Sequence, residues 1–226
     1  MYTSATCARH VGDDGDPSQA PVGCPSLDPD NDAHLQVYFV DDHESLARNA
    51  AVVESHGYCR KTRVEETIDL ARRCGYERLG IAFCIGLRRE AAVLSCVLTA
   101  NGFTVDSVVC KNGGLSKELL QIDDADKVHP GDFEAMCNPI GQARFLEKAD
   151  TQLNIVLTLC VGHDSLFIKY SAAPVTVLAA KDRVLGHKPL GGPLPGRRLL
   201  PEQAVSRYER SGRERRRPRL APHLPT

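Results

Sequence analysis

The sequence predicts an α/β protein with an open parallel sheet of about four strands, helices on both faces and cysteines at the carboxyl edge. Short apolar runs alternate with segments of helical period along the middle of the chain, a pattern typical of repeated strand–helix units. The runs carry few polar residues, as expected of strands buried on both faces of a parallel sheet. The expected strands are 78–84, 103–110, 153–160 and 174–180.

Residues that favour the ends of helices set the bounds of the expected helices. A first helix over 43–55 has apolar residues on one face, and a second begins at the capping box Thr62-Arg-Val-Glu65 and stops before Gly75. Farther on, Asn138 is a good N-cap, and Pro139 is favoured at the first position of a helix. The helices expected between the strands are 87–101, 139–148 and 163–170.

Nothing in the sequence predicts export from the cytosol or insertion into a membrane. The first ten residues, MYTSATCARH, lack the basic and apolar regions of a secretory signal. The longest charge-free apolar stretches, such as 153–162, are too short to span a bilayer. We therefore expect a cytoplasmic protein with no membrane partner. Because thiols stay reduced in the cytosol, nine cysteines indicate packing, metal ligation or thiol chemistry, and not a disulfide framework.

The C-terminal segment 191–226 differs in composition from the rest of the chain. It holds six of the 14 prolines and carries nine Arg against three Glu, a net charge of +6. Since the whole chain carries −1, the remaining residues carry −7, which argues against a nucleic-acid surface on the body. We expect a disordered tail whose arginines are solvated, with a nucleic-acid or partner-binding arm as the weaker alternative.

Cysteines end three of the four predicted strands. Cys84, Cys110 and Cys160 close the first three, and Cys137 lies just before the helix that opens at Pro139. The right-handed crossover rule brings the carboxyl ends of parallel strands to one edge, where open sheets bind ligands. Thiolates suit a zinc ion or an iron–sulfur cluster, and helix N-termini nearby would stabilise them. This pattern predicts a metal-binding protein that serves redox chemistry, sensing or an unknown reaction.

The spacing of these cysteines leaves a second interpretation open. Gaps of 26, 27 and 23 residues match no local zinc-finger or ferredoxin motif, and a free cysteine is commonly a small buried hydrophobe. If the four cysteines only pack, the chain is a small-molecule-binding domain, although it has no glycine-rich phosphate loop. Three cysteines in or beside the helices are expected to pack in either case: Cys59, Cys74 and Cys96.

A thiol-dependent enzyme is a further alternative. Cys160 would be its nucleophile, His163 the base and Asp164 the orienting acid, although three residues within one turn rarely reach triad geometry. A Lys/Arg pair near thiolates would offset their negative charge, so charged residues beyond the last strand are candidates for binding a cofactor. These candidates are Lys181, Asp182, Arg183 and His187. A solvated turn would explain the same residues.

The N-terminal segment 1–34 is a weaker candidate for a metal site. It is rich in Asp, Pro and Gly and shows no apolar periodicity, so we expect irregular structure there. Cys7 and His10 have metal-ligand spacing and Cys24 follows, which gives three potential ligands, one short of a closed zinc site. His34 is a candidate for the fourth, although no spacing requires it.

Six motifs stand out along the chain: KTRVEE, GIAFCIGL, CKNGG, EAMCNPIGQA, LCVGHDSLF and APVTVLAAKDRVLGH. Together they resemble an uncharacterised family of bacterial and archaeal proteins that is described as metal-binding and carries a domain of unknown function. The resemblance covers roughly residues 35–190, which we take as the α/β domain. It implies no reaction, but it does imply a metal-binding role for the cysteine motifs, matched here by Cys84, Cys110, Cys137 and Cys160.

Relatives in that family typically open with a CxxC pair, a further Cys and a Cys-Pro. In this chain Cys7 and the Cys24-Pro25 pair fit that pattern, whereas His10 replaces the second cysteine and the intervening one is missing.

Overall fold

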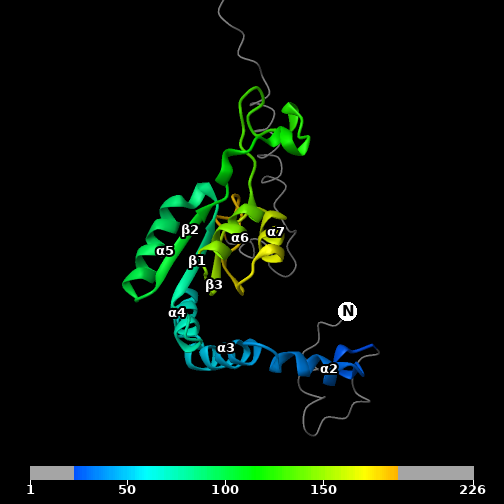
Figure 1. Ribbon diagram of the computed structural model, residues 1–226, viewed down its shortest axis with the longest axis vertical. Coiled ribbons are helices and arrows are strands. Elements are labelled where there is room, and N and C mark those ends of the chain that lie inside the picture. The colour runs from blue at the N-terminus through cyan, green and yellow to red at the C-terminus, as the bar shows by residue number, and fades with distance from the viewer. Residues whose placement is uncertain (1–22, 188–226) are drawn as a thin grey trace, which may run out of the picture. The chain divides into compact units, whose positions relative to one another are not determined.

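A computed structural model describes residues 23–187 of the 226-residue chain (Figure 1). Within this range, residues 23–75 belong to one compact unit and residues 76–187 to a second. The predictions for Cys7, His10 and the segment 191–226 lie outside the described residues.

The first unit is helical. It contains α2 (Asn31–Gln36), α3 (His43–Gly57) and α4 (Arg63–Arg73), with 3₁₀ turns at Pro25–Leu27 and Val37–Phe39. The capping box of α4 is confirmed: the Thr62 side chain accepts from the Glu65 N–H at 3.3 Å, and the Glu65 carboxylate accepts from the Thr62 N–H at 2.7 Å. Helix α2 begins where irregular structure was expected. It has six residues and buries none of them, so it has no apolar periodicity by which to predict it.

The second unit is built on a sheet of four parallel strands, as predicted. The strands are β1 (Arg78–Phe83), β2 (Thr104–Val109), β3 (Leu153–Leu157) and β4 (Val175–Ala179), and their order in the sheet is β2-β1-β3-β4. The helices are α5 (Arg88–Ala100), α6 (Pro139–Lys148) and α7 (His163–Tyr170). Figure 1 shows α5 on one side of the sheet and α6 with α7 on the other. The α/β fold is therefore confirmed.

Three strands differ from the prediction. All five residues of β3 are buried, but the edge strands β2 and β4 are partly exposed, and the Asp106 carboxylate on β2 pairs with Arg78 at 3.0 Å. The strand predicted over 153–160 also ends early, at Leu157. Thr158 has a φ of +56°, which no strand residue adopts, so the chain turns there and Cys160 lies in the loop that follows.

The core below the cysteines lies between the sheet and the helices α6 and α7. Ala82, Val108 and Val156 are neighbours in the strand register and share this buried cluster with Ala143, Leu146 and Phe167 from the helices. Gly80 allows the close approach of β3 and α6. A Cβ at this position would lie 2.1 Å from Asn154 Oδ1 and 2.9 Å from Leu146 Cδ1.

The strand order creates a crevice at the carboxyl edge. The chain leaves β1 toward α5, on one face of the sheet, and leaves β3 toward α7, on the other (Figure 1). Loops that leave neighbouring strands toward opposite faces open a space between them, and open α/β sheets bind ligands there. Cys84 directly follows β1, and Cys160 lies three residues after β3. Within residues 23–187, no helix combines the length and apolar character needed to cross a bilayer.

Candidate functional site

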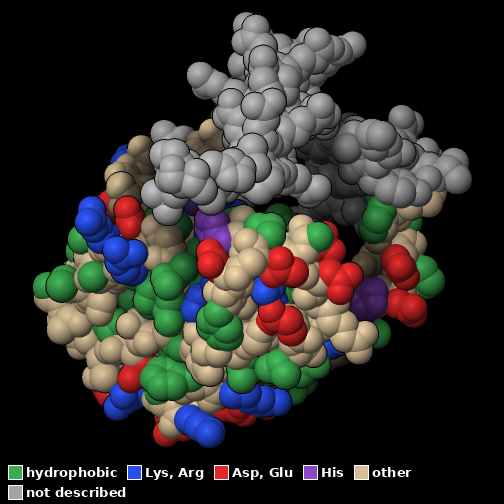
Figure 2. Space-filling model, turned by 90° about the horizontal axis from the view of Figure 1, so that it is seen from above, with side chains coloured by type: hydrophobic (Ala, Val, Ile, Leu, Met, Phe, Trp, Pro, Cys, Tyr) green, Lys and Arg blue, Asp and Glu red, His purple; other side chains and the backbone are tan. Residues whose placement is uncertain are grey.

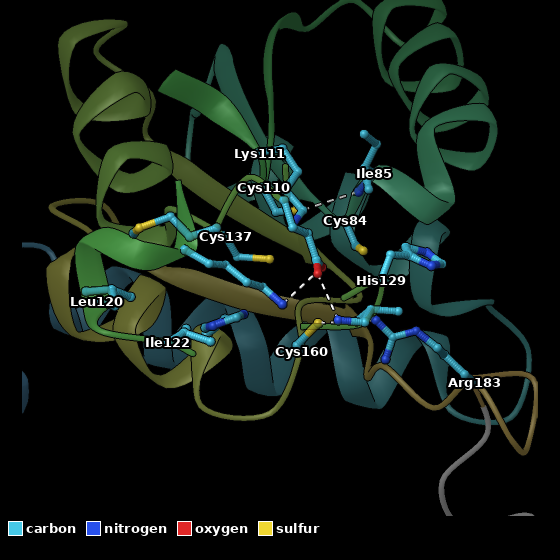
Figure 3. A pocket seen from close by; sticks show the side chains of 15 residues that line it. Cys84, Ile85, Cys110, Lys111, Leu120, Ile122, His129, Cys137, Cys160 and Arg183 are labelled. Carbon is cyan, nitrogen blue, oxygen red and sulfur yellow. Dashed lines mark hydrogen bonds and ion pairs between the residues drawn. The ribbon is translucent and has the colours of Figure 1, made fainter. Parts of the chain in front are cut away.

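A cavity of about 390 Å³ lies at the carboxyl edge of the sheet. Cys84, Cys110, Cys137 and Cys160 all line it, as Figure 3 shows. They come from four places: the end of β1, the end of β2, the segment before α6, and the loop after β3. The remaining wall comes largely from the connection 111–136, together with His163 and Arg183. The topology therefore gathers four cysteines that are far apart in the sequence.

Three side chains in this cavity form a group that could hold a metal ion. The ligand atoms of Cys137, Cys160 and His163 all lie within 4.8 Å of one another. The buried Nδ1 atom of His163 has no hydrogen-bond partner among the described residues. Thiolate sulfur and imidazole nitrogen are the common ligands of zinc, and a buried nitrogen without a partner is costly unless a ligand satisfies it. The residues therefore fit a metal ion.

A tight turn places Cys160 beside His163. The N–H groups of His163 and Asp164 donate to the carbonyl oxygen of Cys160, at 2.9 and 3.1 Å. Gly162, the N-cap of α7, has a φ of +83°, in the left-handed region that favours glycine. The sequence Cys-x-x-His thus folds locally so that the thiol and the imidazole meet at the start of the helix.

Cys137 is held next to Cys110 by a pair of asparagines. The Asn138 N–H donates to the Cys110 carbonyl at 2.7 Å, and Asn138 Nδ2 donates to Asn112 Oδ1 at 3.1 Å. The Asn138 side chain also caps α6 by accepting from the Gly141 N–H at 2.9 Å. One residue therefore fixes the start of the helix, the end of β2 and the position of the preceding cysteine.

Cys84 and Cys110 lie beside the three-residue group and are not part of it. The Cys110 sulfur accepts from the Ile85 N–H at 3.4 Å, and the Lys181 ammonium donates to the Cys84 sulfur. A hydrogen bond to Cys110 and burial raise the pKa of Cys84 to about 12, although the contact with Lys181 acts in the opposite direction. The Cys84 thiol is accordingly protonated at neutral pH.

The electrostatics favour the ligand forms of Cys137 and His163. The hydrogen bond from Cys110 and the charge of Lys111 lower the pKa of Cys137 to about 7, against the effect of burial. The same hydrogen bond is the main cause that raises the pKa of Cys110. Burial, followed by the charge of Lys111, lowers the pKa of His163. Near neutral pH the imidazole is therefore neutral and Cys137 is partly ionised, as metal binding requires.

Of the four residues predicted beyond the last strand, two reach the cysteines. Lys181 contacts Cys84, and Arg183 Nη2 lies 3.6 Å from the Cys160 sulfur. The other two bond to each other in a turn: the Asp182 N–H donates to His187 Nδ1 at 3.1 Å, and the His187 N–H donates to the Asp182 carbonyl at 2.7 Å. The interpretation as a solvated turn thus fits Asp182 and His187, while Lys181 and Arg183 contact cysteines of the cavity.

The arrangement proposed for a thiol enzyme lacks one contact. Cys160 and His163 are close, but the Asp164 carboxylate accepts from the Ser165 N–H at 2.8 Å, while His163 Nδ1 has no hydrogen-bond partner among the described residues. An orienting acid must bond to the base, so Asp164 does not complete a triad in this geometry.

The cysteines outside the cavity lie in varied surroundings. Cys24 is buried and His34 exposed, while Cys74 is half-buried. The prediction that Cys59 and Cys96 pack is wrong, since both are exposed. The buried residues of α5 are Ala91, Leu94 and Leu98, so Cys96 lies on the opposite face of that helix, and Cys59 follows α3 in a turn with a φ of +53°.

The sequence did not predict that His163 joins Cys137 and Cys160 in the three-residue group. His163 was expected to be the base of a thiol enzyme, and Cys84 and Cys110 were expected to be among the metal ligands. The available signal was the Cys-x-x-His spacing of Cys160 and His163, the same spacing that marked Cys7 and His10.

Comparison with known proteins places the chain in a family. The family described as "Protein of unknown function (DUF1847)" matches residues 25–178. An uncharacterized protein of Methanocaldococcus jannaschii is 44% identical over 157 residues, which cover 70% of this chain and 79% of the relative. No solved structure matches the chain significantly. The predicted resemblance to an uncharacterised family is confirmed, and this chain belongs to the DUF1847 family of proteins of unknown function.

Proposed function

We propose that this protein binds a divalent metal ion through Cys137, Cys160 and His163, and that the ion keeps one coordination position open to the cavity. The observation that carries the proposal is the convergence of the three ligand atoms within 4.8 Å. The unpartnered nitrogen of His163 and the lowered pKa of Cys137 support it. Three protein ligands with a fourth position for water or substrate is the arrangement of catalytic zinc sites, including sites with two cysteines and one histidine.

The ligand set favours a single zinc ion over an iron–sulfur cluster. A cluster usually needs four thiolates, and a mixed set of two sulfurs and one imidazole suits zinc. Of the four cysteines, Cys84 is the least suited to ligate a cluster, because its pKa is raised to about 12 and its sulfur already accepts from Lys181. Cys110 lies closer to the group, since it forms a hydrogen bond to Cys137. A colourless protein with one zinc per chain is the expected form.

Metal analysis of single-residue variants tests this proposal. Protein purified without oxygen should carry one zinc ion per chain. Cys137→Ser, Cys160→Ser and His163→Ala should each lower zinc affinity by more than roughly 100-fold, the upper end of the loss seen for residues that only support a ligand. Cys96→Ser removes an exposed thiol of α5 that does not line the cavity, and it should leave the zinc content unchanged.

Three results would contradict the proposal. The first is a protein that stays free of metal when zinc is supplied. The second is a brown protein with several iron atoms per chain, which would favour a cluster. The third is full zinc binding by the His163→Ala variant, which would remove the imidazole from the ligand set.

A further inference from the structure

Two cations line the cavity without a carboxylate partner among the described residues. Arg183 Nη2 lies 3.6 Å from the Cys160 sulfur, and the Lys111 ammonium donates to the Ala135 carbonyl. A third cation in the wall, Lys117, is neutralised by Glu134 at 2.9 Å. The unpaired cations are thus concentrated where the metal ligands lie.

A charge count indicates that the cavity is positively charged. A divalent ion held by two thiolates and a neutral imidazole has no net charge, so Lys111 and Arg183 leave the cavity positive. Glu134 is the one carboxylate among the lining residues that the structure describes, and Lys117 already pairs with it. On the outer surface seen in Figure 2, Asp and Glu side chains are interspersed with Lys and Arg side chains. A cavity of this charge selects anionic ligands.

The cavity also has room for more than an ion, and much of its wall is apolar. Its volume of about 390 Å³ falls in the range of small-molecule sites. The side chains of Ile85, Leu120 and Val128 line it while remaining 45%, 59% and 58% exposed, and Ile122 and Met136 complete the apolar wall. Apolar side chains left open at a cavity are typical of surfaces that a ligand covers.

We propose that the cavity binds a small organic anion, whose charged group lies against Arg183 and Lys111 and whose apolar part contacts Ile85, Leu120 and Val128. The inference rests on the proposed function in one respect: when the metal ion is bound, the charged group of the anion occupies its open coordination position. The anion-binding residues themselves belong to this chain and can be tested with or without the metal.

Titration of the cobalt(II)-loaded full-length protein with four probes tests this inference. The visible bands of cobalt respond to a change of its fourth ligand, and calorimetry gives the affinity. The probes are hexanoate, hexyl phosphate, acetate and 1-hexanol. We expect at least one of the two hexyl anions to bind and to change the cobalt bands, which identifies the charged group. Acetate should bind roughly 200-fold more weakly than hexanoate because it lacks four methylene groups that the cavity would bury, and 1-hexanol should bind least.

Two matched variants complete the experiment. Arg183→Gln should weaken binding of the hexyl anion about tenfold, the effect of losing a charged hydrogen bond. Arg144→Gln removes an exposed arginine of α6 that pairs with Glu147 at 2.6 Å, and it should change nothing. The inference is overturned if neither hexyl anion binds, if 1-hexanol binds equally well, or if Arg183→Gln leaves the affinity unchanged.

The two proposals fail in different ways. If the protein takes up neither zinc nor cobalt, the proposed function fails, and calorimetry with the metal-free protein decides the anion site. If the metal-free protein binds hexanoate or hexyl phosphate and Arg183→Gln weakens this binding, the proposal of an anion site stands. If neither anion binds, that proposal fails as well.

Discussion

Gly162 separates Cys160 from His163 and adopts a φ of +83°. A Cβ at this position would meet no heavy atom within 4 Å, so the need for glycine is conformational and not steric. At the residue scale, the sequence identified the cysteines at the sheet edge but not the ligand set. The pKa values of Cys84 and Cys137 move in opposite directions because the hydrogen bond with Cys110 raises the first and lowers the second, and these contacts join residues far apart in the sequence.

Replacing Gly162 with alanine should weaken metal binding through the backbone. A non-glycine residue in this conformation costs about 1–2 kcal/mol, and the turn can relax only by moving Cys160 away from His163. Gly102→Ala is the matched control, because Gly102 has a φ of +95°, is equally unobstructed and lies in the turn between α5 and β2. Both variants should lose similar stability in urea, and only Gly162→Ala should lose zinc affinity. Equal zinc affinities would show that the turn does not set the ligand positions.

The pH dependence of thiol reactivity should reveal Cys137 in the metal-free protein. Because its pKa is lowered to about 7, half of this thiol is ionised near neutral pH, and the thiolate is the form that reacts. The rate of alkylation of Cys137 by iodoacetamide, followed by peptide mass spectrometry, should rise with pH to a plateau with a midpoint near 7. A midpoint near the ordinary thiol value of about 8.5 would contradict the role of Cys110 and Lys111.

At the scale of elements, α6 fixes the carboxyl ends of β1 and β2. Gln142 is fully buried, and its Nε2 donates to the carbonyls of Val108 at 2.8 Å and Phe83 at 3.3 Å. The beginning of α6 could be predicted, because Asn138 and Pro139 are local signals. The early end of β3 could not be predicted, because a threonine rarely adopts a positive φ. A contact with β4 holds Thr158 in this conformation: its N–H donates to the Ala179 carbonyl at 2.9 Å.

Gly141→Ala should disrupt the asparagine pair that holds Cys137. A Cβ here would lie 2.3 Å from Asn138 Nδ2 and 2.5 Å from Asn112 Oδ1. A glycine-to-alanine change within a helix ordinarily stabilises it by about 1 kcal/mol. In this position the clash should instead destabilise the protein by roughly 1–3 kcal/mol. Urea unfolding would measure this change. In an Asn112→Ala background the cost should be smaller, and a purely additive double-mutant cycle would contradict the account.

At the scale of the whole molecule, the sheet order determines which loops can meet. The alternation of strands and helices predicted the parallel sheet, whereas the order β2-β1-β3-β4 depends on which strands pair across the chain. With β1 and β3 adjacent, Cys84 and Cys160 come to the same crevice, and the connection between β2 and α6 brings Cys110 and Cys137 beside them. The helices α3 and α4, which the sequence grouped with the α/β domain, belong to the unit 23–75.

The X-ray absorption spectrum of the zinc-loaded protein at the zinc edge tests whether Cys137, Cys160 and His163 hold the metal. The spectrum should show two sulfur ligands at about 2.3 Å, one imidazole nitrogen at about 2.0–2.1 Å and one further light atom in the open position. The multiple-scattering signal of imidazole should disappear in His163→Ala. A first shell of four sulfurs, with no imidazole signal, would contradict the account, because it would place Cys84 and Cys110 on the metal in place of His163.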